Sequence, residues 1–225
     1  MQVKLIIPTK LSEIKLKQYQ EFLKIAANND DVNFIQQKIV QIFCSKELRY
    51  VDAMQRKDVV SIANSITALF EQKPKLIRSF KLGSLEFGFI PNLDEMTNGE
   101  YIDLDNYVND WQTMHKAMAV LYRPITKKQK DKYSIEPYVS SITYSEVMEH
   151  MPLDVALSSV VFFWSLGNEL LNSTMHYLEN NKEMQDLVQQ HNLANAGDGI
   201  QVSMHSLREM LQDLMKSQNF PYTNA

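Results

Sequence analysis

The chain contains very few of the residues on which several protein classes depend. It has 225 residues but one cysteine, Cys44, so an internal disulfide and a cysteine-rich metal site are excluded. It has only six glycines, and none of them lies in a glycine-rich phosphate loop or a GxGxxG dinucleotide fingerprint. Because glycine destabilises helix interiors, its scarcity also favours a helical fold.

An excess of positive charge and a long apolar run are absent as well. The formal net charge is -4, so composition gives no general attraction to nucleic acid or to an anionic membrane. The longest apolar run, residues 160–164, is too short to cross a bilayer. The first ten residues, MQVKLIIPTK, lack the apolar core of a signal peptide. We therefore expect a soluble protein with no membrane partner.

The residue patterns that catalysis usually needs are also missing. The five histidines form no HExxH or HxxxH pair, and no GxSxG turn offers a serine nucleophile. Cys44 has no histidine near it in sequence and fits a small buried residue. We therefore predict no catalytic, cofactor-binding or metal-binding residues.

Two charged groups keep alternatives open. The first is a run of carboxylates that could hold a hard cation or act as general acids, namely Asp94, Glu95, Glu100, Asp103, Asp105 and Asp110. The simpler interpretation is that carboxylates in a first helical turn complement the helix dipole. The second group, Lys127, Lys128, Lys130 and Lys132 beside Tyr133, could contact phosphates and stack on bases. In an acidic chain a solvated loop is the favoured interpretation, so nucleic acid is not the favoured partner.

Apolar periodicity predicts a mainly α protein with a small β-hairpin and a short N-terminal strand. Helical spacing covers residues 13–27, 32–43, 46–54, 59–72, 99–123, 144–150 and 152–180. Asp31 and Asp58 are expected N-caps. Further helices are expected after Asn180 and from Ser203.

Strand signals are fewer. Alternating residues predict a strand over 2–7 and a hairpin over 76–90 that turns at Gly83-Ser84. Residues 125–142 fit either a loop or a second hairpin. Along the chain we distinguish a strand-led helical unit (1–74), a middle part with the hairpin, a helix and the basic loop (75–142), and C-terminal helices (143–225), all packed as one domain.

Several segments resemble known phage proteins. The order FKLG (80–83), EF (86–87) and GEYIDL (99–104) resembles tail-assembly chaperones of tailed bacteriophages and related small morphogenesis proteins. LSEIKLKQYQ (11–20) and MHKAMAVLYRPI (114–125) are similar to other phage proteins of unassigned function. The resemblance implies a protein that acts by binding, in the host cytoplasm during assembly or retained in the virion. It brings no catalytic residues with it.

We therefore expect a non-enzymatic structural or assembly protein whose partners are other phage proteins or copies of itself. The long C-terminal helix is the first candidate surface, because it is apolar on most faces near Phe162. The candidate contact residues are Phe162, Phe163, Trp164, Leu166 and Leu170 on this helix and Gly83 and Phe87 at the hairpin. The alternatives are a metal- or nucleotide-dependent enzyme that uses the acidic group, and a packaging protein that contacts nucleic acid.

Overall fold

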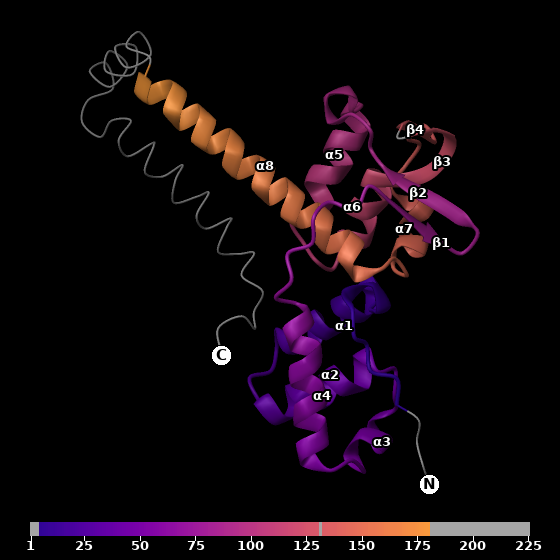
Figure 1. The fold of residues 1–225 in the computed structure, drawn as a ribbon, viewed down its shortest axis with the longest axis vertical. Coiled ribbons are helices and arrows are strands. Elements are labelled where there is room, and N and C mark those ends of the chain that lie inside the picture. Colours follow the sequence, from indigo (N-terminus) through magenta and orange to yellow (C-terminus); the bar gives the residue numbers. More distant parts are fainter. Residues whose placement is uncertain (1–4, 131, 181–225) are drawn as a thin grey trace. The chain divides into compact units, whose positions relative to one another are not determined.

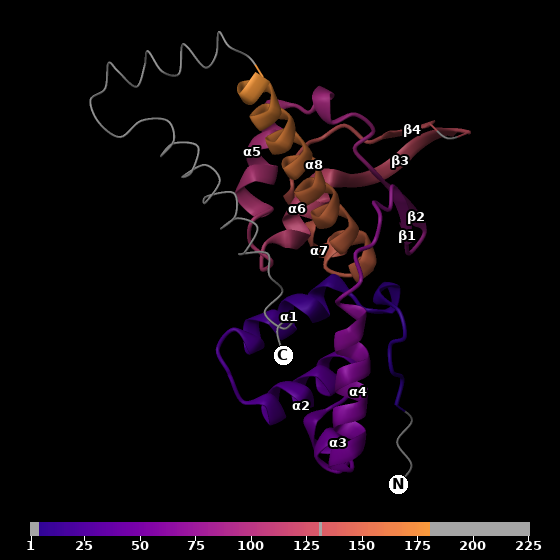
Figure 2. The same cartoon turned by 60° about the vertical axis from the view of Figure 1, so that its left-hand side comes forward.

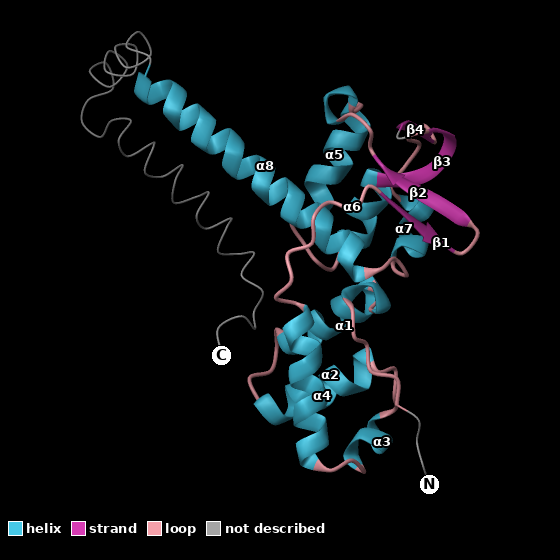
Figure 3. Cartoon of the chain, in the orientation of Figure 1, coloured by secondary structure: helices cyan, strands magenta, loops and turns pink. Residues whose placement is uncertain are grey.

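The computed structural model describes residues 5–130 and 132–180 of the chain. They contain eight α-helices and one small antiparallel sheet, so the prediction of a mainly α fold with a small β element is confirmed (Figures 1 and 3). The chain divides into two compact units, Met1–Val161 and Phe162–Ala225. The helices expected after Asn180 and from Ser203 lie outside the described residues.

The N-terminal part of the first unit is helical. Its elements are a short 3-10 helix (Leu11–Glu13), α1 (Leu16–Ala26), α2 (Val32–Phe43), α3 (Leu48–Asp52) and α4 (Arg56–Leu69). Helix α2 packs against α1, α3 and α4. Aromatic rings fill the space between them, with Phe43 5.4 Å from Phe22 and 5.3 Å from Phe70 between centroids.

The caps and the strand predicted for this part have different outcomes. Asp31 caps α2 as expected, because its carboxylate accepts hydrogen bonds from the backbone N–H groups of Asn33 and Phe34. Asp58 is not a cap; Gln55 occupies that position and Asp58 lies in the first turn of α4. The predicted strand is wrong over residues 5–7, which form no strand, and residues 2–4 lie outside the described part.

Helix α1 begins three residues later than expected because the chain before it pairs with a distant segment. The backbone N–H of Leu16 donates to the oxygen of Met151 (3.0 Å), and that of Leu153 donates to the oxygen of Ile14 (2.8 Å). These bonds hold residues 14 and 15 extended and join the start of α1 to the start of α8 (Leu153–Asn180). The predicted long helix after Pro152 is confirmed.

The sheet has the order β1-β2-β3-β4, with every neighbouring pair antiparallel. Strands β1 (Ser79–Leu82) and β2 (Leu85–Phe89) form the predicted hairpin, and Gly83 turns it with φ +61°. Strands β3 (Tyr122–Gln129) and β4 (Lys132–Ile135) form a second hairpin. The open choice between a loop and a hairpin over 125–142 is thus decided in favour of the hairpin.

The predicted helix over residues 99–123 is wrong in its extent. Helix α5 (Asn98–Tyr107) and α6 (Met114–Leu121) are separated by a turn, and Tyr122 and Arg123 already belong to β3. Pro124 pairs with Phe87 inside the sheet instead of ending a helix. Pairing with β2 satisfies backbone groups that a helix would have satisfied locally.

An aromatic and methionine core lies between the sheet and helices α6, α7 (Ile142–Met148) and the start of α8. Phe80, Phe87 and Phe89 from the first hairpin meet Tyr122 and Tyr144, with ring centroids 5.3 to 5.6 Å apart. The hydroxyl of Tyr122 donates to the backbone oxygen of Ile77 (2.7 Å) and lies 2.8 Å from the Ser159 hydroxyl. Figure 2 shows the far end of the hairpin β3–β4 extending away from these helices.

Candidate functional site

The residues predicted to bind partners on α8 occupy two kinds of environment. Phe162 and Phe163 are half-buried and their rings meet edge to face at 5.3 Å. Trp164 and Leu166 are 38% and 42% exposed, whereas the first turns of the same helix, from Leu153 to Ser159, are largely buried. The side chain of Leu170 lies outside the described residues.

The two candidates at the hairpin also differ. Gly83 lies at the turn, and a Cβ added there would have no atom within 4 Å, so this turn is open to a partner. Phe87 is fully buried, with its ring stacked on Phe80 and edge-on to Tyr144. The prediction that Phe87 contacts a partner therefore needs correction: the β2 pleat points this ring into the core.

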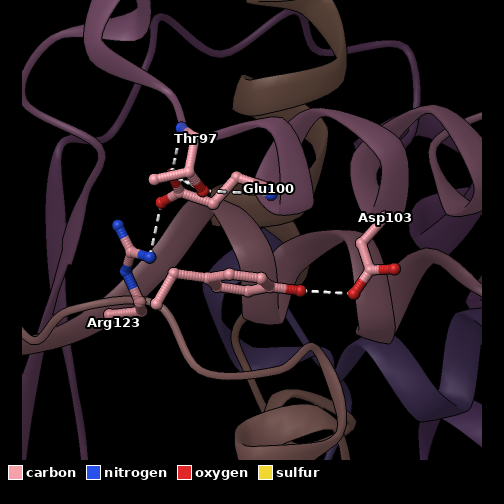
Figure 4. A network of polar contacts seen from close by, with 5 residues as sticks. Thr97, Glu100, Asp103 and Arg123 are labelled. Carbon is pink, nitrogen blue, oxygen red and sulfur yellow. Dashed lines mark hydrogen bonds and ion pairs between the residues drawn. The ribbon is translucent and has the colours of Figure 1, made fainter.

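The acidic group does not form one site, because its members bond to different parts of the fold. Glu100 is buried and forms an ion pair with Arg123 of β3, with 2.5 Å between Oε1 and Nη1 (Figure 4). Its other oxygen, Oε2, accepts from the backbone N–H (2.6 Å) and the hydroxyl (2.8 Å) of Thr97. Thr97 Oγ1 accepts in turn from the N–H of Glu100 (3.3 Å), which completes a capping box at the start of α5.

Opposing effects set the pKa of Glu100. Burial alone would raise it, but the two hydrogen bonds from Thr97 and the positive charge of Arg123 together hold the pKa below its ordinary value. The guanidinium of Arg123 is itself buried and lies 5.5 Å from the ring centroid of Tyr138. Among the described residues its Nε has no hydrogen-bond partner. The pair is therefore a tertiary link between α5 and β3, held mainly by charge.

Asp103, one turn further along α5, bonds to a different residue. Its carboxylate accepts a hydrogen bond from the hydroxyl of Tyr138 (Figure 4), which lowers the pKa of Asp103. Burial and then this bond raise the pKa of Tyr138 to about 12. Ser141 also contributes hydrogen bonds to Asp103. These contacts fix the segment 138–141 against α5.

Two further acidic side chains, Asp110 and Glu95, bond locally. Asp110 accepts from the backbone N–H of Gln112 (2.8 Å), and Glu95 accepts from the side chain of Asn92 (2.9 Å). Within residues 5–130 and 132–180 no three His, Cys, Asp or Glu side chains gather as metal ligands would. The carboxylates that the sequence groups together are thus spread over caps, a turn and one buried ion pair.

The lysine group lies on the hairpin β3–β4, and all four side chains are exposed. Lys128 forms an ion pair with Glu86 of β2 at 2.6 Å. Tyr133 is half-buried, its hydroxyl lies within hydrogen-bonding distance of the backbone oxygens of Phe89 (2.8 Å) and Arg78 (3.0 Å), and its ring lies against Gly88. The exposed charges can attract an acidic partner, whereas the tyrosine ring is engaged in joining β4 to the first hairpin.

Two other candidate reactive residues have structural surroundings. Cys44 is buried, and burial raises the pKa of its thiol to about 11, so the thiol stays protonated and weakly nucleophilic. Nδ1 of His115 lies 3.1 Å from Nε2 of Gln20, which also donates to the oxygen of Trp111 (2.6 Å). This bonding ties α1 to the turn before α6.

Three exposed apolar side chains were not expected from the sequence. Ile102, Val139 and Ile142 are 48%, 84% and 73% exposed, and each is next in sequence to a residue of the contact that joins Asp103 with Tyr138 and Ser141. We name these three residues the 102–142 patch. No local pattern predicts the patch, because Ile102 continues the apolar periodicity of its helix and Val139 and Ile142 come from a segment about forty residues away.

No protein-family model, curated protein or solved structure matches this chain. Among the described residues, no helix combines the length and the apolar character that a bilayer crossing requires.

Proposed function

We propose that this chain is a non-enzymatic bacteriophage structural or assembly protein that acts through protein–protein contacts. The observation that carries the proposal is the presence of large apolar side chains at the surface in two places. One is the part of α8 that contains Trp164 and Leu166, and the other is the 102–142 patch, where Val139 reaches 84% exposure. Apolar groups gathered at a surface are typical of sites that another protein covers.

The electrostatics support binding over catalysis. A catalytic centre brings ionisable groups together around a reacting atom and shifts their pKa values for that task. Here Glu100 and Asp103 have lowered pKa values and are held by Arg123 and Tyr138, respectively, in contacts that join elements of the fold. The phage assignment itself rests on the resemblance of residues 11–20, 80–83, 86–87, 99–104 and 114–125. With it we propose that the chain acts in the host cytoplasm during assembly or is retained in the finished virion.

A photo-crosslinking amino acid placed on α8 tests this proposal. At Leu166 it is expected to give covalent adducts with another structural protein of the same phage, identified by mass spectrometry during particle assembly. The matched control is the same amino acid at Asn64, an exposed polar position on α4, which should give few adducts.

Mass spectrometry of purified particles then separates the two forms of the proposal. A fixed number of copies per particle indicates a virion component, and adducts with a phage protein in the lysate without retention in particles indicate a chaperone. If neither adducts nor retention are seen, the proposal is wrong.

A further inference from the structure

The 102–142 patch has an acidic border. Asp105 lies three residues after Ile102 on α5, and Glu146 lies four residues after Ile142 on α7, so each carboxylate is on the same helix face as an apolar member of the patch. Both are exposed. Among the described residues neither of the two takes part in an ion pair, although Glu146 interacts electrostatically with Lys17 of α1. The surface is therefore apolar at its centre and negatively charged at its edge.

The second hairpin has the opposite charge. The far end of this hairpin exposes Lys127, Lys130 and Lys132. Of the hairpin's described lysines, only Lys128 forms an ion pair. Lys130 has φ +52°, a left-handed conformation that glycine or asparagine adopts more readily. The hairpin end thus carries an excess of positive charge on a projecting element, because these lysines outnumber the one carboxylate, Asp131, that stands among them in the sequence (Figure 2).

We propose that two copies of this chain associate reciprocally, with the basic hairpin end of each copy on the acidic and apolar 102–142 patch of the other. We infer a second copy as the partner from charge complementarity, because the chain carries both the negative surface and a positive element. The same contact then forms twice around a two-fold axis, as in most homodimers. Lys132 lies on the edge strand β4, where lysine discourages strand addition, so the contact uses side chains.

This inference names one partner for the proposed function and rests on it only in requiring a surface that binds protein. The two fail separately. A monomeric chain that still crosslinks to another phage protein through Leu166 contradicts the dimer and leaves the proposed function standing. A chain that dimerises but forms no adducts with another phage protein contradicts the proposed function and leaves the dimer standing.

Charge exchange tests the dimer directly. One variant carries Lys127→Glu, Lys130→Glu and Lys132→Glu, and a second carries Asp105→Lys and Glu146→Lys. Sedimentation velocity of the full chain over a range of concentrations at low and high salt is the measurement. The wild type should dimerise, and the dimer should weaken as salt rises. Each variant alone should weaken dimerisation by roughly tenfold or more, because like charges then face each other.

An equimolar mixture of the two variants should restore the dimer, since each hairpin end then meets a patch of opposite charge. The matched control replaces three exposed lysines of the helical part, Lys10, Lys24 and Lys57, by glutamate. It changes the net charge as much as the hairpin variant does and should leave the dimer intact. Val139→Ser with Ile142→Ser removes apolar contact without changing charge and should weaken the dimer also.

Three results would overturn the inference. The first is a wild type that stays monomeric at high concentration and low salt. The second is a dimer that all the charge variants preserve, which would put the contact elsewhere. The third is retention of a DNA or RNA oligonucleotide that the hairpin variant loses while its dimer persists, which would assign the lysines to nucleic acid.

Discussion

The hairpins β1–β2 and β3–β4 both have a two-residue turn, between Leu82 and Leu85 in the first and between Gln129 and Lys132 in the second. Both place a residue of positive φ first in the turn, Gly83 in one and Lys130 in the other. The first hairpin directs Phe80, Phe87 and Phe89 into the core. The second buries only its base, at Tyr122, Arg123 and Pro124, and exposes its far half.

This difference separates two uses of the same motif. In the first hairpin the turn residue is the one that the backbone prefers, and the strands contribute apolar surface to the core. In the second, a lysine occupies a strained position and the strands beyond Ile125 contribute charge to the surface. One hairpin is optimised for stability, and the other is compatible with a role in contacts.

Phe87→Ala should lower the free energy of unfolding by about 4 kcal/mol, because it leaves a cavity where three aromatic rings meet. Leu85→Ala, in the same strand but 47% exposed, should lower it by less than about 1 kcal/mol. Urea denaturation followed by circular dichroism measures both. Similar losses for the two variants would mean that the first hairpin is not anchored through its buried face.

Glu100→Gln should lower the free energy of unfolding by about 3 kcal/mol at neutral pH, because Arg123 at the base of the second hairpin loses its buried counter-charge. The pKa of Glu100 is lower in the folded chain than its ordinary value of 4.5. Its contribution is therefore present above that value and is lost as pH falls through the folded pKa.

The pH dependence gives a control for the same substitution. The difference between wild type and Glu100→Gln should shrink as the pH falls below 4.5. Denaturant titrations at pH 7, 5, 4 and 3 measure it. A difference that stays constant with pH would show that the charge of Glu100 is not what stabilises the contact.

Gly88→Ala should lower the free energy of unfolding by about 2 kcal/mol, because the two hairpins meet closely at this residue. A Cβ there would lie 2.5 Å from the Tyr133 ring and 2.9 Å from Ile125. The ring has little freedom to move, since its hydroxyl bonds to the backbone of Phe89 and Arg78. In a Tyr133→Ala background the same change should have a much smaller effect, and a double-mutant cycle by thermal denaturation would detect the coupling.

The two turn residues should respond in opposite directions. Gly83→Ala should lower the free energy of unfolding by about 1 kcal/mol, because alanine strains the left-handed conformation. Lys130→Gly should raise it by about 0.5 kcal/mol, since glycine relieves that strain but adds entropy to the unfolded chain. Lys130→Gly should also weaken self-association in sedimentation velocity, whereas Gly83→Ala should not. If Gly83→Ala and Lys130→Gly changed self-association equally, the second hairpin would have no special role in contacts between copies.

Local signals predicted the elements whose bonds are local. The turn at Gly83 and the cap at Asp31 depend on residues within four positions of each other. The same reasoning failed at the turn between α5 and α6 and at Tyr122 and Arg123, where helical apolar spacing continues into β3. Tyr122 and Arg123 pair with β2, more than thirty residues earlier, and this pairing is invisible in a local pattern.

The candidate surfaces divide in the same way. Trp164 and Leu166 were identified from apolar character alone and are partly exposed. Phe87 has the same character but faces inward, because the direction of a strand side chain depends on the sheet around it. The 102–142 patch has no sequence signature, since its parts come from α5 and from the segment before α7.

The sequence alone determined the helical class, the first hairpin and the absence of cysteine and glycine motifs. Each of these depends on composition or on neighbours along the chain. Only the tertiary structure decided that Glu100 serves as a buried partner of Arg123, that Phe87 is core, and that an acidic apolar surface and a basic hairpin end occur in one unit. The physical reason is that burial and charge pairing are properties of residues distant in sequence, and folding alone brings them together.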